Sequence, residues 1–300
     1  MNDKLVSVII PTYGRPNFLG KAVNSVLKQT HPNIEIIIID DNHSNSLARI
    51  ETEQLMAKFL KNDNIIYVKH KKNKRVAAAR NTGVHLAKGD YISFLDDDDE
   101  FYENKIKEQI KFLEINQLYN GCYCKFKSFS NNKLTRESSY TSQGDLSLDV
   151  YKFRCTGNAS CYMFKKDVFL QSGDFNEELP RHEDFEFLVR FFEKNLMGFV
   201  DNYGVKRNTD SRINMPSIQQ YIDIKRKFFK SVEKNLNNLP KLEVKKIQKI
   251  HDADLFFFCL RKKDFLKAIT FFPGFLAMIS YLYVKLPNIQ ELLKRNLILK

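Results

Sequence analysis

Apolar runs and amphipathic segments alternate along the first hundred residues of the chain. Each apolar run is four to six residues long, which predicts a buried strand, and the second run holds isoleucine at five of its six positions. The predicted strands are 6–10, 34–39, 65–68 and 91–95, and the segments with helical spacing are 19–27, 46–61 and 76–87. Gly89 is expected to close the last of these helices. Strands that alternate with helices predict a doubly wound, mostly parallel α/β sheet.

The pattern changes twice after this region. Alternating apolar residues at 121–129 and 160–164 predict two added strands, and 185–192 predicts a helix that follows an acidic loop. The last part of the chain then turns to lysine-rich amphipathic helices. We therefore divide the chain into a ligand-binding α/β domain at 1–215 and a basic amphipathic helical region at 216–300.

Charge is distributed unevenly along the chain. Residues 1–200 hold 28 basic and 27 acidic residues, whereas 201–300 hold 20 basic and 9 acidic residues, so nearly all of the net charge of +12 lies in the last third. A basic appendage is typical of proteins that meet an anionic surface, either nucleic acid or membrane. Five cysteines, an odd number, favour free thiols in a reducing compartment. Because no signal peptide and no run of about 20 apolar residues is visible, we expect a cytoplasmic protein.

Acidic residues follow two of the predicted strands. Asp40 and Asp41 end the second strand, and four aspartates, Asp96–Asp99, follow the fourth. In doubly wound sheets the ligand binds beyond the carboxyl ends of the strands, so both groups are expected in one crevice. Carboxylates gathered there repel one another unless a cation is present, and Mg²⁺ or Mn²⁺ with substrate phosphates suits such oxygen ligands. A solvated acidic turn that caps the following helix is the alternative.

Four segments of the chain form one ordered pattern: VSVIIPTYGRP, a strand ending in IDDNHS, AAARNTGVHLAKGDYISFLDDDD, and HED before a helix. In order and spacing this pattern resembles a family-2 glycosyltransferase of the GT-A fold. The resemblance covers roughly residues 5–205 and has no counterpart in the last hundred residues. It implies a GT-A nucleotide-sugar-binding catalytic domain, metal-dependent transfer of a hexosyl or N-acetylhexosaminyl group, and a role in surface polysaccharide biosynthesis.

The resemblance also implies roles for individual residues of the nucleotide-sugar site. Asp41 matches the acid that hydrogen-bonds the nucleotide base, usually uracil. Pro11 and Tyr13 match the lip that contacts and stacks on that base. Arg80 and Asn81 match the pair that lines the nucleotide pocket.

Metal and phosphate binding are implied in the same way, with Mn²⁺ or Mg²⁺ as the expected cofactor. Asp96 and Asp98 frame an Asp-x-Asp motif, in which Asp98 matches the direct metal ligand and Asp96 lies nearer the ribose. Asp97, also expected among the nucleotide-sugar-binding residues, stands where the family usually has a small residue, which leaves open which of these aspartates binds the metal. Many members have a histidine after the last core strand, where this chain has Lys206 and Arg207. Either cation can neutralise the diphosphate; the alternative is that the role of the histidine is absent from this chain.

Asp184, in a His-Glu-Asp segment, matches the general base that deprotonates the acceptor hydroxyl. The adjacent Glu183 is expected to raise the pKa of Asp184 and is the next candidate for the base. One base and no enzyme nucleophile imply direct displacement with inversion at the anomeric carbon, while the divalent cation stabilises the leaving diphosphate. Taken alone, the two acids would be helix N-terminal residues favoured by the helix dipole.

Together these features predict an inverting glycosyltransferase that moves a sugar from a nucleotide-sugar donor, usually a UDP-sugar, to a hydroxyl of a glycan or lipid-linked acceptor. A sugar nucleotidyltransferase also joins such a sheet to Mg²⁺, but it favours a glycine-rich loop where 12–16 has a single glycine. A non-enzymatic membrane-binding or nucleic-acid-binding module would explain the basic region and leave the acidic crevice unexplained.

The basic region at 216–300 carries apolar stripes beside its lysines, a pattern typical of helices that lie in a membrane interface. We expect peripheral contact with the inner face of the cell membrane and no binding of nucleic acid. Packing on the catalytic domain or formation of a homo-oligomer is the alternative for this region.

Overall fold

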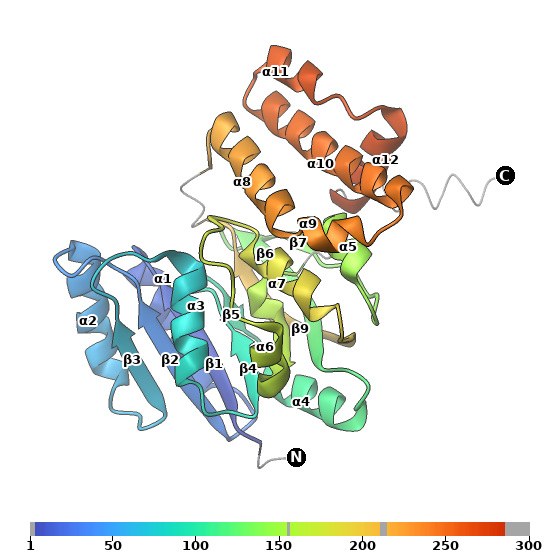
Figure 1. Ribbon diagram of the computed structural model, residues 1–300. Helices are drawn as coiled ribbons and strands as arrows, with labels where there is room; N and C mark the ends of the chain where they lie inside the picture. The colour runs from blue at the N-terminus through green and yellow to red at the C-terminus, as the bar shows by residue number, and fades with distance from the viewer. Residues whose placement is uncertain (1–3, 155–156, 211–214, 286–300) are drawn as a thin grey trace. The chain divides into compact units, whose positions relative to one another are not determined.

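The computed structural model describes residues 4–154, 157–210 and 215–285, which form two compact units (Figure 1). The first unit comprises the described residues up to 146 together with 157–210. The second unit comprises 147–154 and 215–285.

The segment 147–154 differs from the domain division that we drew from the sequence, which placed all of 1–215 together. This segment packs in the second unit because two of its groups bind helix α10 (Lys241–Arg261). The carbonyl of Tyr151 hydrogen-bonds the His251 ring at 2.8 Å, and Lys152 forms an ion pair with Glu243 at 2.8 Å. These contacts join residues about a hundred positions apart, so sequence spacing gave no sign of them.

One mixed sheet organises the first unit, in the order β3-β2-β1-β4-β8-β6-β9-β5, with β7 paired to β6. The four strands β3, β2, β1 and β4 are parallel, as the sequence predicted. Strand β8 runs antiparallel to both β4 and β6, and β9 runs parallel to β6. The strands are β1 (Val6–Thr12), β2 (Ile34–Asp40), β3 (Ile65–Lys69), β4 (Tyr91–Phe94), β5 (Glu100–Phe101), β6 (Gly121–Ser130), β7 (Lys133–Glu137), β8 (Tyr162–Lys165) and β9 (Met197–Asn208).

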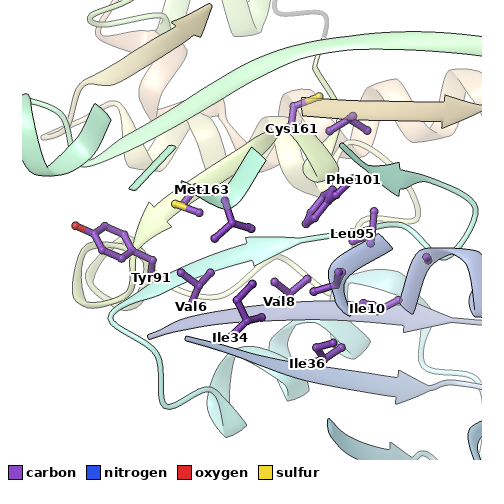
Figure 2. Packing of buried hydrophobic residues seen from close by; sticks show 14 of the residues in the cluster. Val6, Val8, Ile10, Ile34, Ile36, Tyr91, Leu95, Phe101, Cys161 and Met163 are labelled. Carbon is purple, nitrogen blue, oxygen red and sulfur yellow. The ribbon is translucent and has the colours of Figure 1, made fainter. Parts of the chain in front are cut away.

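Helices cover both faces of the parallel strands. Val6, Val8 and Ile10 point to one face of β1 and share a buried cluster with Ile34 and Ile36 of β2 (Figure 2). The apolar sides of α1 and α4 complete that cluster. Helix α3 packs on the other face, so closely that a Cβ added at Gly83 would lie 2.4 Å from Ile9. The helices of this unit are α1 (Pro16–Leu27), α2 (Leu47–Phe59), α3 (Arg75–Leu86), α4 (Lys105–Ile115), the 3-10 turn η1 (Ala159–Cys161), α6 (Lys166–Ser172) and α7 (Glu183–Phe191).

Gly89 does not cap α3, contrary to the prediction. The helix ends at Leu86, and Ala87 follows in an extended conformation. The N–H of Gly89 instead donates to Ser7 Oγ at 2.9 Å, where an added Cβ would meet that oxygen at 2.6 Å. Glycine is therefore needed at this position for close approach to β1, not for a helix cap.

The register of the parallel strands brings their carboxyl ends to one edge of the sheet. Thr12 at the end of β1 lies opposite Asp40 at the end of β2, and Ile9 lies opposite Phe94 at the end of β4. The residues that follow these strands therefore border a common crevice, as the strand order predicted.

The second unit is helical. Lys225 lies within a lysine-rich segment but is 3% exposed, because it forms an ion pair with Asp254 at 2.7 Å. The hydroxyls of Tyr221 and Tyr281 also donate to Asp254, so three helices share one buried carboxylate. The helices are α5 (Ser147–Tyr151), α8 (Ile218–Ser231), α9 (Glu233–Asn237), α10, α11 (Phe265–Thr270) and α12 (Phe275–Lys285). Across the described ranges, none of the helices combines the length and apolar character needed to cross a membrane.

Candidate active site

The four aspartates after β4 differ in exposure and in partners. The side chain of Asp97 is fully buried, accepts a hydrogen bond from Thr12 Oγ1 at 2.7 Å and pairs with Arg15 at 2.6 Å. Asp98 is 13% exposed and pairs with the same guanidinium, also at 2.6 Å. The sequence analysis gave Arg15 no role, although it follows the strand end that we expected to border the crevice.

A second loop holds the other two aspartates. The amide of Asn158 donates to Asp96 at 3.2 Å and to Asp99 at 2.8 Å, and the hydroxyl of Ser160 donates to Asp99 at 2.8 Å. Because β8 runs antiparallel to β4, its amino end and the residues before it lie at the carboxyl end of β4. Sequence analysis predicted this strand without its direction and therefore missed both residues.

These surroundings shift the pKa values of the aspartates in different directions. Burial raises the pKa of Asp97 to about 7, against the opposing charge of Arg15. Burial and the charge of Asp96 raise the pKa of Asp99 to about 7. Burial also disfavours the charge of Asp96, but the charge and hydrogen bond of Arg80 outweigh it and lower that pKa. Asp97 and Asp99 therefore support the turn, while Asp96 and Asp98 keep exposed carboxylate surface of 26% and 13%.

Arg80 connects the aspartate turn to Glu183, the residue before the predicted general base Asp184. Its guanidinium lies 2.7 Å from Asp96 and 2.8 Å from Glu183, and its side chain is only 5% exposed. The rings of Phe94 and Phe175 lie 5.9 Å and 5.6 Å from the guanidinium carbon. The structure thus places Arg80 at a fixed junction between the Asp96 side and the Glu183 side of the crevice.

Asp184 is the second residue of α7, after Glu183, and the helix is preceded by His182, whose backbone has a positive φ of 68°. The side chain is half-buried. Burial first, and then the charge of Glu183, raise the pKa of Asp184 to about 7. Arg80 and Asp96 are close enough for their charges to act on the same carboxyl. A carboxyl with this pKa beside the crevice has the properties of a general base.

Two residues predicted to bind the nucleotide are buried and shape the walls of the crevice. The carboxylate of Asp41 accepts the backbone N–H groups of Lys74 and Arg75 and hydrogen-bonds the His70 ring at 2.7 Å. Asn81 exchanges hydrogen bonds with the backbone of Phe175, donating and accepting at 2.9 Å. Asp41 and Asn81 are 2% and 4% exposed, so both hold neighbouring loops in place.

Of the two residues predicted to contact the nucleotide base, one is buried and one is exposed. Pro11 is part of β1 and buried, opposite Ile39 of β2. Tyr13 follows the strand with 51% of its surface exposed, so its ring is accessible for stacking. The adjacent loop is fixed by a hydrogen bond of 2.7 Å from the N–H of Gly14 to Asn42.

Lys206 and Arg207 point to opposite sides of β9, because successive side chains of a strand alternate. The charge of Arg207 contributes to the lowered pKa of Asp96 and opposes the raised pKa of Asp99, which places Arg207 toward the acidic turn. Lys206 pairs with Glu100 at 3.0 Å and lines a separate hollow of about 1000 Å³. Of the two predicted phosphate contacts, the geometry favours Arg207.

The acidic turn fits a metal ion whose coordination shell is completed by the substrate. Within the residues that the structure describes, no three His, Cys, Asp or Glu side chains gather in a metal-binding group. Mg²⁺ is commonly held by one or two carboxylates and completed by phosphate oxygens and water. The exposed carboxylates of Asp98 and Asp96 suit such a shared site, whereas a cage made by protein alone does not form here.

Known proteins that resemble this chain in sequence are glycosyltransferases. A family model described as glycosyl transferase family 2 matches residues 7–170. An uncharacterized glycosyltransferase of Rickettsia conorii is 42% identical over 212 residues, which are 67% of this chain and 32% of that protein. One of Methanocaldococcus jannaschii is 27% identical over 238 residues, which are 75% of this chain and 80% of that protein. The chain spans about a third of the length of the first curated relatives it matches.

Solved structures share the same architecture. Staphylococcus aureus TarS 1-349, crystallised in complex with UDP-GlcNAc, superimposes with a TM-score of 0.65 at 17% identity, over 89% of this chain and 90% of that one. The structure of TarS 1-349 described without a ligand gives a TM-score of 0.63. This likeness confirms the predicted GT-A fold class.

Proposed function

Because the chain belongs to glycosyl transferase family 2, we propose that it is an inverting glycosyltransferase that moves a hexosyl or N-acetylhexosaminyl group from a UDP-sugar to an acceptor hydroxyl. The single observation that carries this proposal is the position of Asp184, whose pKa is raised to about 7, directly after Glu183, which Arg80 links to Asp96 of the acidic turn. In this proposal one carboxyl takes the proton of the acceptor, and a separate acidic group faces the leaving diphosphate. This division of roles suits direct displacement.

In this proposal Asp98 and Asp96 hold Mn²⁺ or Mg²⁺ together with the diphosphate. The cation would act as a Lewis acid that stabilises the charge of the leaving group. Arg207 would approach the same phosphates from β9, since its charge already acts on the acidic turn. Tyr13 would stack on the base, and Asp41, through the loop it fixes, would set the depth of the base pocket.

A donor screen tests the assignment directly. Hydrolysis of UDP-sugars and GDP-sugars should be measured with Mn²⁺ and with EDTA, beginning with UDP-GlcNAc because a structurally similar protein was crystallised with it. Turnover of a UDP-sugar that depends on Mn²⁺ would support the proposal. Turnover confined to GDP-sugars, or equal in EDTA, would contradict the donor or the metal assignment respectively.

The pH dependence of transfer follows from the pKa of Asp184. The base must be deprotonated to accept the hydroxyl proton, and its pKa is raised to about 7. We therefore expect kcat/KM to increase with pH up to about 7 and then to level off, since the carboxyl loses its proton across that range. Rate measurements from about pH 5.5 to pH 9 check this, and a constant rate below pH 7 would contradict the assignment.

We also propose that the acceptor belongs to a surface polysaccharide pathway and is carried on a lipid, with the second unit docking on an anionic membrane. Helices α11 and α12 and the turn between them leave seven large apolar side chains between 40% and 84% exposed. Residues 261–279, which include these side chains, hold four cations against one acid, Asp264, which caps α11. The apolar residues are Phe265, Leu266, Ile269, Phe272, Phe275, Leu276 and Ile279, and the cations are Arg261, Lys262, Lys263 and Lys267.

This combination fits a lipid surface better than a solvated helix. Apolar side chains would enter the interface while lysines and arginines meet anionic headgroups, each contributing about 1 kcal/mol. The apolar residues 256–258 of α10 pack inside the unit instead, because Phe258 is buried and Phe257 stacks on Tyr281 with ring centres 5.4 Å apart. The docking face is therefore assigned to α11 and α12 alone.

Co-sedimentation with vesicles containing phosphatidylglycerol should detect the full chain at low salt, with less binding at high salt. The double variant Leu266→Glu, Leu276→Glu should bind about ten-fold more weakly or worse, because two exposed leucines are lost from the interface. Leu242→Glu is the matched control, since Leu242 is 64% exposed at the start of α10. Wild-type protein that stays in the supernatant would contradict docking. A dimer that the double variant converts to a monomer would assign the face to a second copy.

A further inference from the structure

Arg15 pairs with two neighbouring aspartates of the acidic turn and stays partly exposed. Its guanidinium is 2.6 Å from Asp97 and 2.6 Å from Asp98. Its backbone is fixed, because Arg15 is the N-cap residue of α1 and Pro16 follows it. Its side chain is nevertheless 32% exposed, so the guanidinium can leave the acids without any change in the main chain.

Arg80, which also pairs with this turn, is held more firmly than Arg15. Arg80 is 5% exposed and is bound on two sides, by Asp96 and Glu183. If Arg15 leaves, Asp97 keeps its hydrogen bond from Thr12 at 2.7 Å. Departure of Arg15 therefore leaves Asp97 with its Thr12 partner and removes a positive charge from Asp98, which is the proposed metal ligand.

We propose that Arg15 is an exchangeable counter-ion of the active site. It pairs with Asp98 while the crevice lacks a divalent cation, and it donates to the donor diphosphate once Asp98 is bound to that cation. A planar guanidinium is suited to both partners, since it forms paired hydrogen bonds with carboxylates and with phosphates. The exchange rests on the proposed function, because it requires both the metal and the diphosphate.

Two binding measurements with opposite expected signs test this exchange. Binding of Mn²⁺ without nucleotide is followed by electron paramagnetic resonance, and binding of UDP at saturating Mn²⁺ by calorimetry. Arg15→Gln should bind Mn²⁺ alone about ten-fold more tightly, because a competing positive charge is gone. It should bind UDP with Mn²⁺ about ten-fold more weakly, because a charged hydrogen bond to phosphate is lost.

Two further variants keep the result interpretable. Arg15→Lys retains the charge without the planar fork and should fall between wild type and Arg15→Gln in both measurements. It also serves if the glutamine variant does not fold. Lys21→Gln removes an exposed cation from the same helix and should match wild type.

The outcome that overturns the exchange is unchanged or weaker binding of Mn²⁺ to Arg15→Gln in the absence of UDP. Wild-type protein whose UDP binding is the same in EDTA would overturn it as well. That second result would contradict the metal part of the proposed function, whereas the first leaves the proposed function standing, so the two failures are distinguishable.

Discussion

Asp184→Asn is expected to bind donor normally and to lose transfer, with kcat lower by about 100-fold to 10,000-fold, the usual contribution of a general base. The carboxyl acts on the acceptor proton and not on the donor, so the donor KM should change little. An amide of the same shape cannot accept that proton, and it preserves the packing at the start of α7. Initial-rate kinetics with the donor found in the screen, together with calorimetry of UDP, measure both effects.

The control for this variant is Asp63→Asn, which removes an exposed acid from the loop after α2. It should transfer sugar at the wild-type rate. Turnover of Asp184→Asn close to that of the control would move the base to another residue. Glu183→Gln would then be the next variant, although the ion pair of Glu183 with Arg80 at 2.8 Å makes it a less available proton acceptor.

Asp98→Ala is expected to weaken Mn²⁺-dependent UDP binding by about 100-fold or more, since loss even of a residue that supports a metal ligand costs up to about that much. The same variant should make the remaining UDP affinity equal in Mn²⁺ and EDTA. Calorimetry in the two buffers gives both values. UDP binding that stays Mn²⁺-dependent would exclude Asp98 as the direct ligand.

Asp97→Asn tests whether Asp97 or Asp98 is the direct metal ligand in the aspartate turn. Asp97 is fully buried against Thr12 and Arg15, so its variant should keep the dependence of UDP binding on Mn²⁺. A lower midpoint of thermal unfolding is the effect expected instead, because the variant weakens a buried ion pair. Loss of metal dependence in Asp97→Asn, with retention in Asp98→Ala, would reverse our assignment.

The parallel part of the sheet and its acidic edge were predictable because both depend on local order in the sequence. The isoleucine run of β2 predicts burial on both faces, and all seven residues of that strand are buried. Strands that alternate regularly with helices favour a parallel sheet, so residues after β1, β2 and β4 were expected to border one crevice. The sequence alone therefore determined the fold class and the region of the chain where the chemistry is placed.

Sequence alone did not determine which charged groups pair with one another. Arg15 pairs with an acid 83 residues away and Arg80 with one 103 residues away, and neither separation follows from a repeat or a motif. The exposure of each of the four consecutive aspartates depends on those partners. Only the folded chain therefore shows which of the aspartates keep a carboxylate available for a metal ion. The same reason separates Arg207 from Lys206, because only the strand direction and pairing of β9 show which of them faces the turn.

The second unit shows the same limit most clearly. A lysine-rich sequence predicts solvated helices, yet Lys225 is buried because Asp254, 29 positions later, supplies a counter-charge inside the unit. Burying a lysine is costly without such a partner, and periodicity along one helix carries no information about the next. Periodicity determined that these helices are amphipathic, and tertiary packing alone decided which apolar stripes became core and which, on α11 and α12, stayed exposed.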